Sequence, residues 1–432
     1  MHGSRAASAG TLIVGAGQSG LQLAVSLREG GYTAPITLAG AEAGGPYQRP
    51  PLSKAFLAGT VDEDNLALRA AGFYTDHDID IVPASRIVTV SPDRGDGGSA
   101  LIDGGRVLRF ERLALTTGSR PRRLTVPGAD LFGVCYLRSV DDAGRLRRLL
   151  EAARDVVVIG GGFIGLEVAA AARRRGLQVT VVESSGRLLK RVVAPPISEF
   201  YRQAHEKRGV HFRMGCGVTA VHGDGNNRVT TVELSDGTQV AADIVIVGIG
   251  VEPRIELARQ LGLDCARGII VDDRAQTSIP SVVAAGDCTV QPHPQYPETL
   301  VGLESVQNAV DQAKVAAATI LGLSRPPAVV PWFWSDQADL KLQIAGLSTG
   351  YDEFVVRGDP ATESFSVLYY RQLRLIAVDA VNQPHDFMAV KRALALGVSI
   401  PAAVAGDTRS SLKSRMGASD QADERLTVGV RP

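Results

Sequence analysis

Hydrophobic residues along this chain gather in short runs that end at glycine-rich turns. Two of these runs, Thr11–Val14 and Val156–Ile159, are each followed by such a turn, a stretch with helical periodicity and a second apolar run. The helical stretches and second runs cover residues 21–29 and 36–39 in the first copy, and 166–175 and 178–182 in the second. A strand, a helix and a strand in this order predict a β-α-β unit with parallel strands. The repeat therefore predicts an α/β fold that contains two such units.

The apolar pattern continues downstream of the second unit. Runs at residues 229–234, 243–250 and 282–288 read as buried strands, and residues 305–321 have helical periodicity. Pro326 and Pro327 mark a linker into a last region, where strands are expected at 352–356, 364–370 and 373–378. Residues 406–432 are polar and without a period, so we expect this tail and residues 1–9 to be disordered.

Composition excludes several classes of function. The 432 residues include 46 Lys or Arg and 46 Asp or Glu, so a formal net charge of zero gives no global attraction to nucleic acid. No apolar run reaches the roughly 18 residues of a membrane span, and the first ten residues lack the apolar core of a secretory signal. We therefore expect a cytoplasmic protein without a membrane span.

Cysteine spacing argues against thiol or zinc chemistry. The four cysteines are far apart, with no CxxC pair and no zinc-ligand spacing, at Cys135, Cys216, Cys265 and Cys288. We expect reduced, buried thiols and no metal site.

The two glycine-rich turns share the spacing GxGxxG. Their glycines are Gly15, Gly17 and Gly20 in the first copy, and Gly160, Gly162 and Gly165 in the second. The first glycine allows the tight turn, the second lets the backbone approach a pyrophosphate, and the third lets the helix pack closely on the strand. One copy alone is as consistent with a plain turn, but two copies in strand-turn-helix-strand context predict two Rossmann-like dinucleotide-binding domains.

The acid at the end of the second strand of each unit bears on which dinucleotide is bound. Glu183 occupies this position in the second unit, where a carboxylate accepts hydrogen bonds from a ribose 2′-OH and repels a 2′-phosphate, which favours NADH over NADPH. Arg187 and Arg191 follow and are read as diphosphate contacts or a solvated face, with a 2′-phosphate contact as the alternative. The first unit has no acid at the corresponding position, Ala41, and Glu42 is the nearest substitute.

Four further segments carry a family resemblance: 47–54 (YQRPPLSK), 117–122 (TGSRPR), 286–288 (GDC) and 331–337 (PWFWSDQ). With these motifs, residues 11–404 resemble the oxygenase-coupled NADH-dependent ferredoxin reductases, the putidaredoxin reductase and biphenyl-dioxygenase reductase group. The resemblance implies a glutathione-reductase-like fold with a C-terminal α/β domain at 327–405. It also implies an FAD-binding domain formed by 10–117 and 246–326, with an NADH-binding domain at 118–245 inserted into it.

The resemblance also implies site residues. Contacts to FAD would come from Gly15, Gly17, Ser19, Arg49, Lys54, Ile87, Arg138, Asp287 and Val306, with Gly20 in the same turn and Glu42 as the substitute acid. Contacts to NADH would come from Ile164, Glu167, Glu183, Gly250 and Glu304, with the glycines of the second turn.

The chemistry of the residues themselves also supports some of these implied contacts. Asp287 follows a buried run and a glycine, where its carboxylate would accept hydrogen bonds from the ribitol, or else simply form a turn. The helix after Glu304 would present its N-terminus to the negative charge of reduced flavin. The resemblance implies that Lys54 and Glu167 form an ion pair beside the flavin, whereas the residues alone suggest two ordinary surface charges.

The family's activity is implied for the same reasons. NADH would deliver hydride to FAD, which would pass single electrons to a [2Fe–2S] ferredoxin that feeds a cytochrome P450 or a dioxygenase. Trp334 would lie over the flavin on the path of electron exit, whereas Trp332 and Phe333 are read as filling a domain interface. The acidic ferredoxin would meet basic residues, for which Lys314, Lys341, Lys391 and Arg392 are candidates.

Two alternatives remain at this point. An NADH oxidase, peroxidase or disulfide reductase of the same fold would need a reactive cysteine beside the flavin, and residues 45–58 contain none. A flavoprotein resembling apoptosis-inducing factor would use cofactor reduction as a conformational switch, with slow turnover. The segment around Trp334 favours ferredoxin reduction over this switch.

Overall fold

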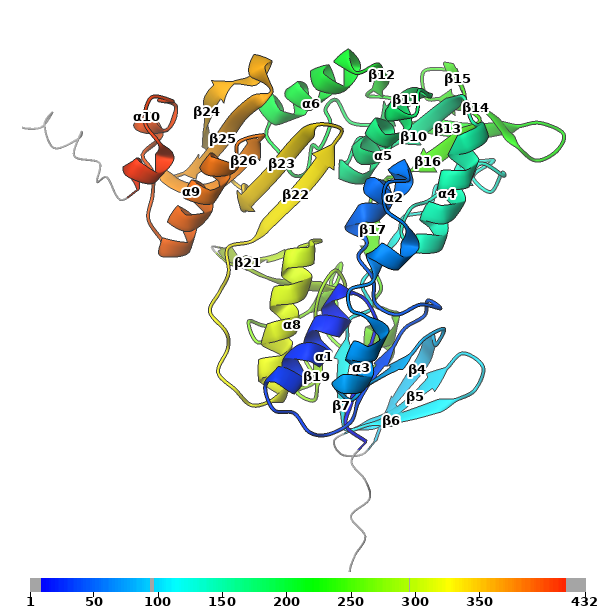
Figure 1. The fold of residues 1–432 in the computed structure, drawn as a ribbon, viewed down its shortest axis with the longest axis vertical. Coiled ribbons are helices and arrows are strands. Elements are labelled where there is room, and N and C mark those ends of the chain that lie inside the picture. Colours follow the sequence, from blue (N-terminus) through cyan, green and yellow to red (C-terminus); the bar gives the residue numbers. More distant parts are fainter. Residues whose placement is uncertain (1–8, 94–96, 295, 417–432) are drawn as a thin grey trace, which may run out of the picture. The chain divides into compact units, whose positions relative to one another are not determined.

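The computed structural model describes residues 9–93, 97–294 and 296–416, which form two compact units (Figure 1). The first unit comprises the described residues up to Pro51 together with 61–122 and 251–328. The second comprises 52–60, 123–250 and the described residues from Val329 onward. Each unit contains one of the two predicted β-α-β units, and the assignment of FAD to one and NADH to the other stays a prediction.

The centre of the first unit is a five-stranded parallel sheet. Its strands run in the order β19 (Val282–Ala284), β7 (Arg112–Leu115), β1 (Thr11–Val14), β2 (Ile36–Ala39) and β3 (Ile79–Val82). All four residues of β1 are buried, as expected for a central strand with helices on both faces. The helices α1 (Gln18–Glu29) and α8 (Val306–Ile320) pack side by side within this unit (Figure 1).

Smaller elements complete the first unit. An antiparallel sheet contains β4 (Ile87–Pro92), β5 (Gly98–Ile102) and β6 (Val107–Phe110). A two-stranded ribbon pairs β8 (Ser119–Pro121) with β17 (Val251–Pro253), and a third group contains β18 (Ile269–Ile270), β20 (Thr289–His293) and β21 (Tyr296–Val301). Short helices are η1 (Pro50–Ser53, which runs into the second unit), η2 (Glu63–Leu66), α3 (Ala71–Asp76) and α7 (Glu256–Gln260).

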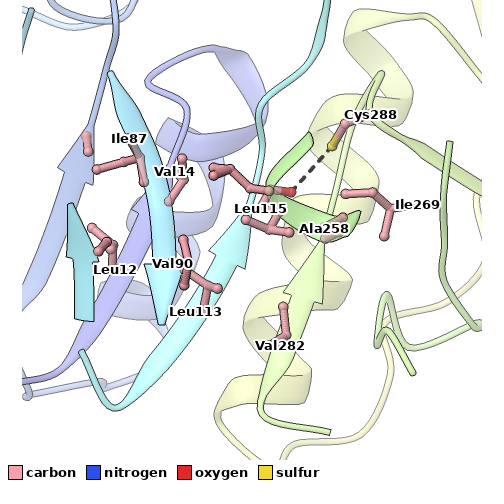
Figure 2. Close-up of a cluster of buried hydrophobic side chains, with 14 of the residues drawn as sticks. Leu12, Val14, Ile87, Val90, Leu113, Leu115, Ala258, Ile269, Val282 and Cys288 are labelled. Carbon is pink, nitrogen blue, oxygen red and sulfur yellow. Dashed lines mark hydrogen bonds between the residues drawn. The ribbon is translucent and has the colours of Figure 1, made fainter. Parts of the chain in front are cut away.

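Figure 2 shows how the core of the first unit joins residues that are far apart in sequence. Leu12 of β1 and Leu113 of β7 lie in one buried cluster with Val90 of β4 and Ile269 of β18. The Cys288 thiol donates to the carbonyl of Leu115 at 3.5 Å. Burying each of these aliphatic side chains stabilises the fold by roughly 1.5–3 kcal/mol.

The second unit contains another five-stranded parallel sheet. Its order is β12 (Val210–Met214), β11 (Gln178–Glu183), β10 (Asp155–Ile159), β16 (Ile244–Val247) and β9 (Val134–Cys135). An antiparallel sheet of β13 (Val218–Gly223), β14 (Val229–Leu234) and β15 (Gln239–Ala241) accompanies it. The helices of this part are α2 (Ala55–Ala58), α4 (Val140–Ala152), α5 (Phe163–Arg174) and α6 (Pro195–Lys207).

The C-terminal part of the second unit is a five-stranded antiparallel sheet. Its order is β22 (Trp332–Gln337), β23 (Leu340–Gly346), β26 (Arg374–Val381), β25 (Ser364–Arg371) and β24 (Glu353–Asp359). The helix α9 (Pro384–Leu396) packs on β26 and β23, and η3 (Pro360–Thr362), α10 (Ala402–Ala405) and η4 (Leu412–Arg415) are short. The predicted α/β class is thus confirmed for both units. No helix of the described residues has the length and apolarity that crossing a membrane requires.

Two sequence predictions need correction. The helices after the glycine turns begin earlier than predicted, at Gln18 and Phe163, because the third glycine of each motif is itself helical. The prediction of a disordered tail is wrong for residues 406–416. There the buried guanidinium of Arg357 donates to the carbonyls of Asp407 at 2.6 Å and Ser410 at 2.8 Å, and Leu412 is buried. Residues 1–8 and 417–432 of the predicted disordered ends lie outside the described residues.

A buried carboxyl in the C-terminal sheet makes stability depend on pH. Asp379 of β26 is fully buried and accepts from the Tyr369 hydroxyl, and its Oδ1 has no hydrogen-bond partner among the described residues. Burial raises the pKa of Asp379 from 3.8 to about 7. The folded state therefore binds a proton that the unfolded state has released between these two values, so the free energy of unfolding falls as pH rises through this window.

Replacing this carboxyl should remove that dependence. Between pH 4 and pH 7 the unsubstituted protein should lose at most about 4 kcal/mol of its free energy of unfolding, and Asp379→Asn should not show this loss. Above pH 8 we expect Asp379→Asn to be more stable than the unsubstituted protein. Urea unfolding at several pH values measures this. Asp80→Asn, at an exposed position on β3, is the control and should retain the dependence. Equal slopes in both variants would contradict the assignment to Asp379.

Candidate active site

The first glycine turn joins β1 to α1 in the first unit. Gly15 has φ +119°, and a Cβ on it would lie 2.1 Å from the carbonyl oxygen of Thr116. A Cβ on Gly20 would lie 2.0 Å from the carbonyl oxygen of Gly15. These two glycines are therefore required by the backbone itself, the first by its left-handed conformation and both by close approach.

The second glycine turn repeats this geometry between β10 and α5. Gly160 has φ +107°, and a Cβ on it would lie 2.3 Å from the carbonyl oxygen of Gly248. A Cβ on Gly165 would lie 2.1 Å from the carbonyl oxygen of Gly160. Equivalent positions thus carry equivalent constraints in both units, which is the repeat that the sequence predicted.

The middle glycines have no such explanation within the protein. Gly17 and Gly162 have φ −98° and −84°, which any residue adopts, and no heavy atom of the described chain lies within 4 Å of an added Cβ. Both are the N-caps of their helices, neither cap has a side-chain hydrogen bond, and the buried hydroxyl of Ser19 lacks a partner in the described part of the chain. A diphosphate at each helix N-terminus explains all three observations, so the residues fit two dinucleotides.

Glu183 lies beside the second glycine turn, at the end of β11. Its carboxylate accepts from the backbone N–H of Gly161 at 2.7 Å and from that of Ser185 at 2.7 Å. These bonds fix the carboxylate at the end of the strand, where the 2′-OH of an adenosine ribose is recognised in dinucleotide-binding folds.

One of the two readings of Arg187, a solvated face, is wrong. Its guanidinium donates to the carbonyl of Val193 at 2.7 Å, the hydroxyl of Ser198 at 2.8 Å and the carbonyl of Lys190 at 2.8 Å. Arg187 therefore ties its own loop to the start of α6 and is not a freely solvated side chain, whereas its contact with a diphosphate stays a prediction. Arg191 is exposed. Of the two arginines, it is the one whose guanidinium stays available to bind a 2′-phosphate, which would oppose a preference for NADH.

A cluster of three polar side chains follows β2 in the first unit. Arg49 donates to Glu42 at 2.5 Å and to the Tyr47 hydroxyl at 2.9 Å, and Tyr47 donates to the other oxygen of Glu42 at 2.5 Å. Burial alone would lower the pKa of Arg49, but Tyr47 and Glu42 raise it overall. The acid that we expected to substitute for Ala41 thus holds Arg49 in place, and its contact with the adenosine stays a prediction.

The remaining predicted FAD contacts of the first unit lie at element ends. Asp287 follows Gly286 at the end of β19 and accepts from the hydroxyl of Ser119 at 3.1 Å. Ile87 is different, because its side chain is 8% exposed and belongs to the core shown in Figure 2. Val306 begins α8, directly after its N-cap Ser305, and Glu304 is exposed just before that cap.

In the second unit, Lys54 and Glu167 form the ion pair that the family resemblance implied. Nζ of Lys54 lies 2.8 Å from Oε2 of Glu167, and the side chains are 17% and 1% exposed. The alternative of two ordinary surface charges is therefore wrong. Breaking a buried pair by removing one partner typically costs about 3–5 kcal/mol, because the other charge is left uncompensated.

Two serines that the sequence analysis missed complete this ion pair. The hydroxyl of Ser53 donates to Oε2 of Glu167 at 2.5 Å, and that of Ser335 donates to Oε1 at 2.6 Å. Both serines are buried. Their positions inside the two family motifs at 47–54 and 331–337 were the available signal, but a serine in a motif gives no hint of its partner.

Aromatic side chains alternate along β22. Phe333 packs on Phe163 of α5, with ring centroids 4.7 Å apart, whereas Trp332 faces Phe387 of α9 at 6.0 Å. The Nζ of Lys391 lies 4.5 Å above the Trp332 ring. Phe333 thus contacts a helix of the predicted NADH-binding domain, whereas these partners of Trp332 belong to its own predicted C-terminal domain, so the interface prediction is not borne out for Trp332. Trp334 is half-buried, 5.4 Å from the Trp332 ring, and its place at the flavin stays a prediction.

Three further predicted contacts belong to the second unit. Ile164 is 46% exposed on the first turn of α5, Gly250 has φ +101° directly before β17, and the backbone of Arg138 donates to Asp142 at 3.1 Å. The contact of Ile164 with the nicotinamide stays a prediction.

The cysteines do not offer reactive thiols. All four are free, and Cys135 and Cys288 are buried as predicted, but Cys216 and Cys265 are half-exposed, contrary to prediction. Burial raises the pKa of Cys135 to about 11 and raises that of Cys288 above its usual range. Since the thiolate is the nucleophile, neither buried thiol is activated. No group of three or more metal-binding side chains occurs in the part of the chain that the structure describes.

Known proteins resemble this chain over most of its length. Residues 10–313 match the family model described as pyridine nucleotide-disulphide oxidoreductase, and residues 332–416 match one described as reductase C-terminal. Rhodocoxin reductase of Rhodococcus erythropolis is 44% identical over 402 residues, which cover 93% of each chain. A rubredoxin-NAD(+) reductase of Pseudomonas putida is 43% identical over 389 residues, 90% of this chain and 98% of that one.

A solved structure gives the same picture. The ferredoxin reductase for the CYP199A2 system from Rhodopseudomonas palustris is 42% identical, with a TM-score of 0.90, and the match covers 94% of this chain and 99% of that one.

Alanine at the middle glycines should separate the two dinucleotides. Because a Cβ at Gly17 or Gly162 meets no protein atom, we expect both variants to keep the fold and to lose affinity for one ligand each, by at least about tenfold. Gly17→Ala should be purified with depleted flavin, and Gly162→Ala should keep its flavin but show a raised KM for NADH. Flavin absorbance, circular dichroism and steady-state kinetics measure these effects, and each variant is the control for the other. Loss of both ligands in either variant would contradict the separation.

Proposed function

This chain belongs to the pyridine nucleotide-disulphide oxidoreductase family, and from that premise we propose that it is an FAD-dependent reductase that carries electrons from NADH to a [2Fe–2S] ferredoxin. The observation that carries the proposal is the pair of middle glycines, Gly17 and Gly162, which each lie at a helix N-terminus with open space around an added Cβ, as close approach of a diphosphate would require. Bound FAD would supply hydride acceptance and one-electron donation, which no side chain of the protein supplies.

The residues of this chain would bind and orient the two dinucleotides. The N-termini of α1 and α5 would hold one diphosphate each, and Glu183 would accept hydrogen bonds from the NADH ribose. Lys54 and Glu167 would border the site of hydride transfer as a fixed ion pair, and Trp334 would cover the flavin. Positioning of this kind accelerates a reaction by holding the reacting groups near contact and by excluding water.

The absence of activated thiols supports electron transfer over disulfide chemistry. Disulfide reductases of the same family use a cysteine pair, and here all four cysteines are free, with burial opposing ionisation at Cys135 and Cys288. Four free cysteines also support a cytoplasmic location, which remains a prediction. The similar proteins include a ferredoxin reductase and a rubredoxin-NAD(+) reductase, which supports an iron-containing electron carrier as the partner, and the oxygenase it feeds would be a cytochrome P450 or a dioxygenase.

Anaerobic reduction followed by transfer to an iron–sulfur protein tests this function. We expect NADH to bleach the flavin rapidly, and a [2Fe–2S] ferredoxin to be required for reduction of cytochrome c. A rubredoxin in place of the ferredoxin is the matched control for the partner. Rapid bleaching with no transfer to either protein would overturn the proposal in favour of an oxidase or a redox switch.

Coenzyme preference tests the role of Glu183 separately. Because its carboxylate would repel a 2′-phosphate, the unsubstituted protein should prefer NADH to NADPH in kcat/KM by at least about a hundredfold. We expect Glu183→Gln to reduce that preference by about tenfold, mainly through the KM for NADPH. Arg187→Lys, at a residue bound within its own loop, should leave the preference unchanged. An unchanged preference in Glu183→Gln would contradict the assignment.

A further inference from the structure

The Lys54–Glu167 pair is one end of a longer buried chain of hydrogen bonds. Oε1 of Glu167 accepts from Ser335 at 2.6 Å, Ser335 accepts from the side-chain amide of Gln337 at 3.2 Å, and Oε1 of Gln337 lies 2.8 Å from Nε2 of His205. Ser335 and Gln337 are fully buried and His205 is 1% exposed. The chain therefore links α5, β22 and α6 inside the second unit, away from solvent.

Every bond in this chain points toward the carboxylate. The amide oxygen of Gln337 can only accept, so His205 donates to it from Nε2. Burial lowers the pKa of His205, which is consistent with a neutral ring that carries its proton on Nε2. The amide of Gln337 then donates to Ser335, whose hydroxyl proton is directed at Glu167. Hydrogen bonds aligned in one direction polarise one another, and a hydrogen bond to a charged acceptor is stronger than one to a neutral acceptor.

Gln337 determines whether this chain of hydrogen bonds can conduct protons. A neutral amide does not pass on a proton as a hydroxyl or an imidazole does, so the chain is no path for protons from Glu167 to His205. Its effect is instead geometric. Without the Gln337 amide, the Ser335 hydroxyl would be free to rotate to another acceptor, because a hydroxyl rotates about its own bond.

The strand adds a second constraint. Ser335 directly follows Trp334 on β22, and successive side chains of a strand point to opposite faces. The bond from Ser335 to Glu167 therefore also fixes the strand that carries Trp334 against α5. Phe333 strengthens this attachment, since it shares a face with Ser335 and packs on Phe163 of α5.

We propose that Ser335, oriented by Gln337 and His205, is a positioning residue that aims the Glu167 carboxylate at Lys54 and sets Trp334 relative to that pair. This rests on the proposed function, in which the ion pair borders the site of hydride transfer. The serine acts through Glu167 and touches neither dinucleotide.

Ser335→Ala tests the proposal in the FAD-loaded protein. We expect the rate of flavin reduction at saturating NADH to fall by about tenfold, because a charge-assisted hydrogen bond to the carboxylate is lost, while the KM for NADH stays unchanged. In the Glu167→Gln background the same substitution should cause no further loss, as a double-mutant cycle requires of two coupled groups. Ser335→Thr, which keeps the hydroxyl, should restore most of the rate.

A crystal structure of Ser335→Ala supplies a readout that does not depend on activity. We expect the Glu167 carboxylate to rotate and the contact between Lys54 Nζ and Glu167 Oε2 to lengthen from 2.8 Å beyond hydrogen-bond distance. Ser366→Ala is the matched control, because Ser366 is equally buried in the same sheet and donates to a different carboxylate, Asp386, at 3.0 Å. It should lose comparable stability on unfolding and retain the rate of flavin reduction.

The outcomes separate the two proposals. If NADH does not reduce the flavin of the unsubstituted protein, the proposed function fails, and the crystal structure still tests the positioning role. An unchanged reduction rate in Ser335→Ala with an active parent, an equal rate loss in Ser366→Ala, or an undisturbed Lys54–Glu167 contact would each overturn the positioning role alone.

Discussion

The second unit depends on a carboxylate that is removed from water and must be compensated there. Glu167 is 1% exposed at its side chain, and its partners come from 114 residues before it, in Ser53, and 168 residues after it, in Ser335. A buried charge without partners costs several kcal/mol, so these segments cannot separate from α5 without a large loss of stability. One helical residue thus holds together three pieces of chain that the sequence places far apart.

A different constraint acts at the two glycine turns. There the backbone passes so close to itself that Gly15, Gly20, Gly160 and Gly165 admit no Cβ, whereas Gly17 and Gly162 stand in open space. The first kind of glycine is a condition of the fold, and for the second kind we propose a role in binding a ligand. Because the same division appears in both units, the two helix N-termini have equivalent chemistry, and the proposed difference between the ligands would come from other residues such as Glu183.

Membership of a family named for disulphide chemistry does not imply that chemistry here. The cysteines are far apart and free, and the best buried of them have a raised pKa. The groups that we propose for the reaction are Lys54, Glu167 and Trp334, which are charged or aromatic and need no covalent intermediate. The C-terminal sheet contributes Ser335, which donates to Glu167, and Phe333, which packs on Phe163, and these contacts join the sheet to α5 within one compact body.

The sequence by itself determined the α/β class, the two β-α-β units and the glycine positions, because these follow from local periodicity and from backbone sterics within a few residues. It also indicated the Lys54–Glu167 pair, although only through a family resemblance. The tertiary structure alone decided that Arg187 is bound within its own loop, that residues 406–416 are ordered by the buried Arg357, and that Ser53 and Ser335 hold Glu167. Some of these contacts join residues that lie far apart in the chain. Others depend on which of several nearby acceptors a long side chain reaches. No local pattern encodes such a choice, since it is made by the packing of the elements around it.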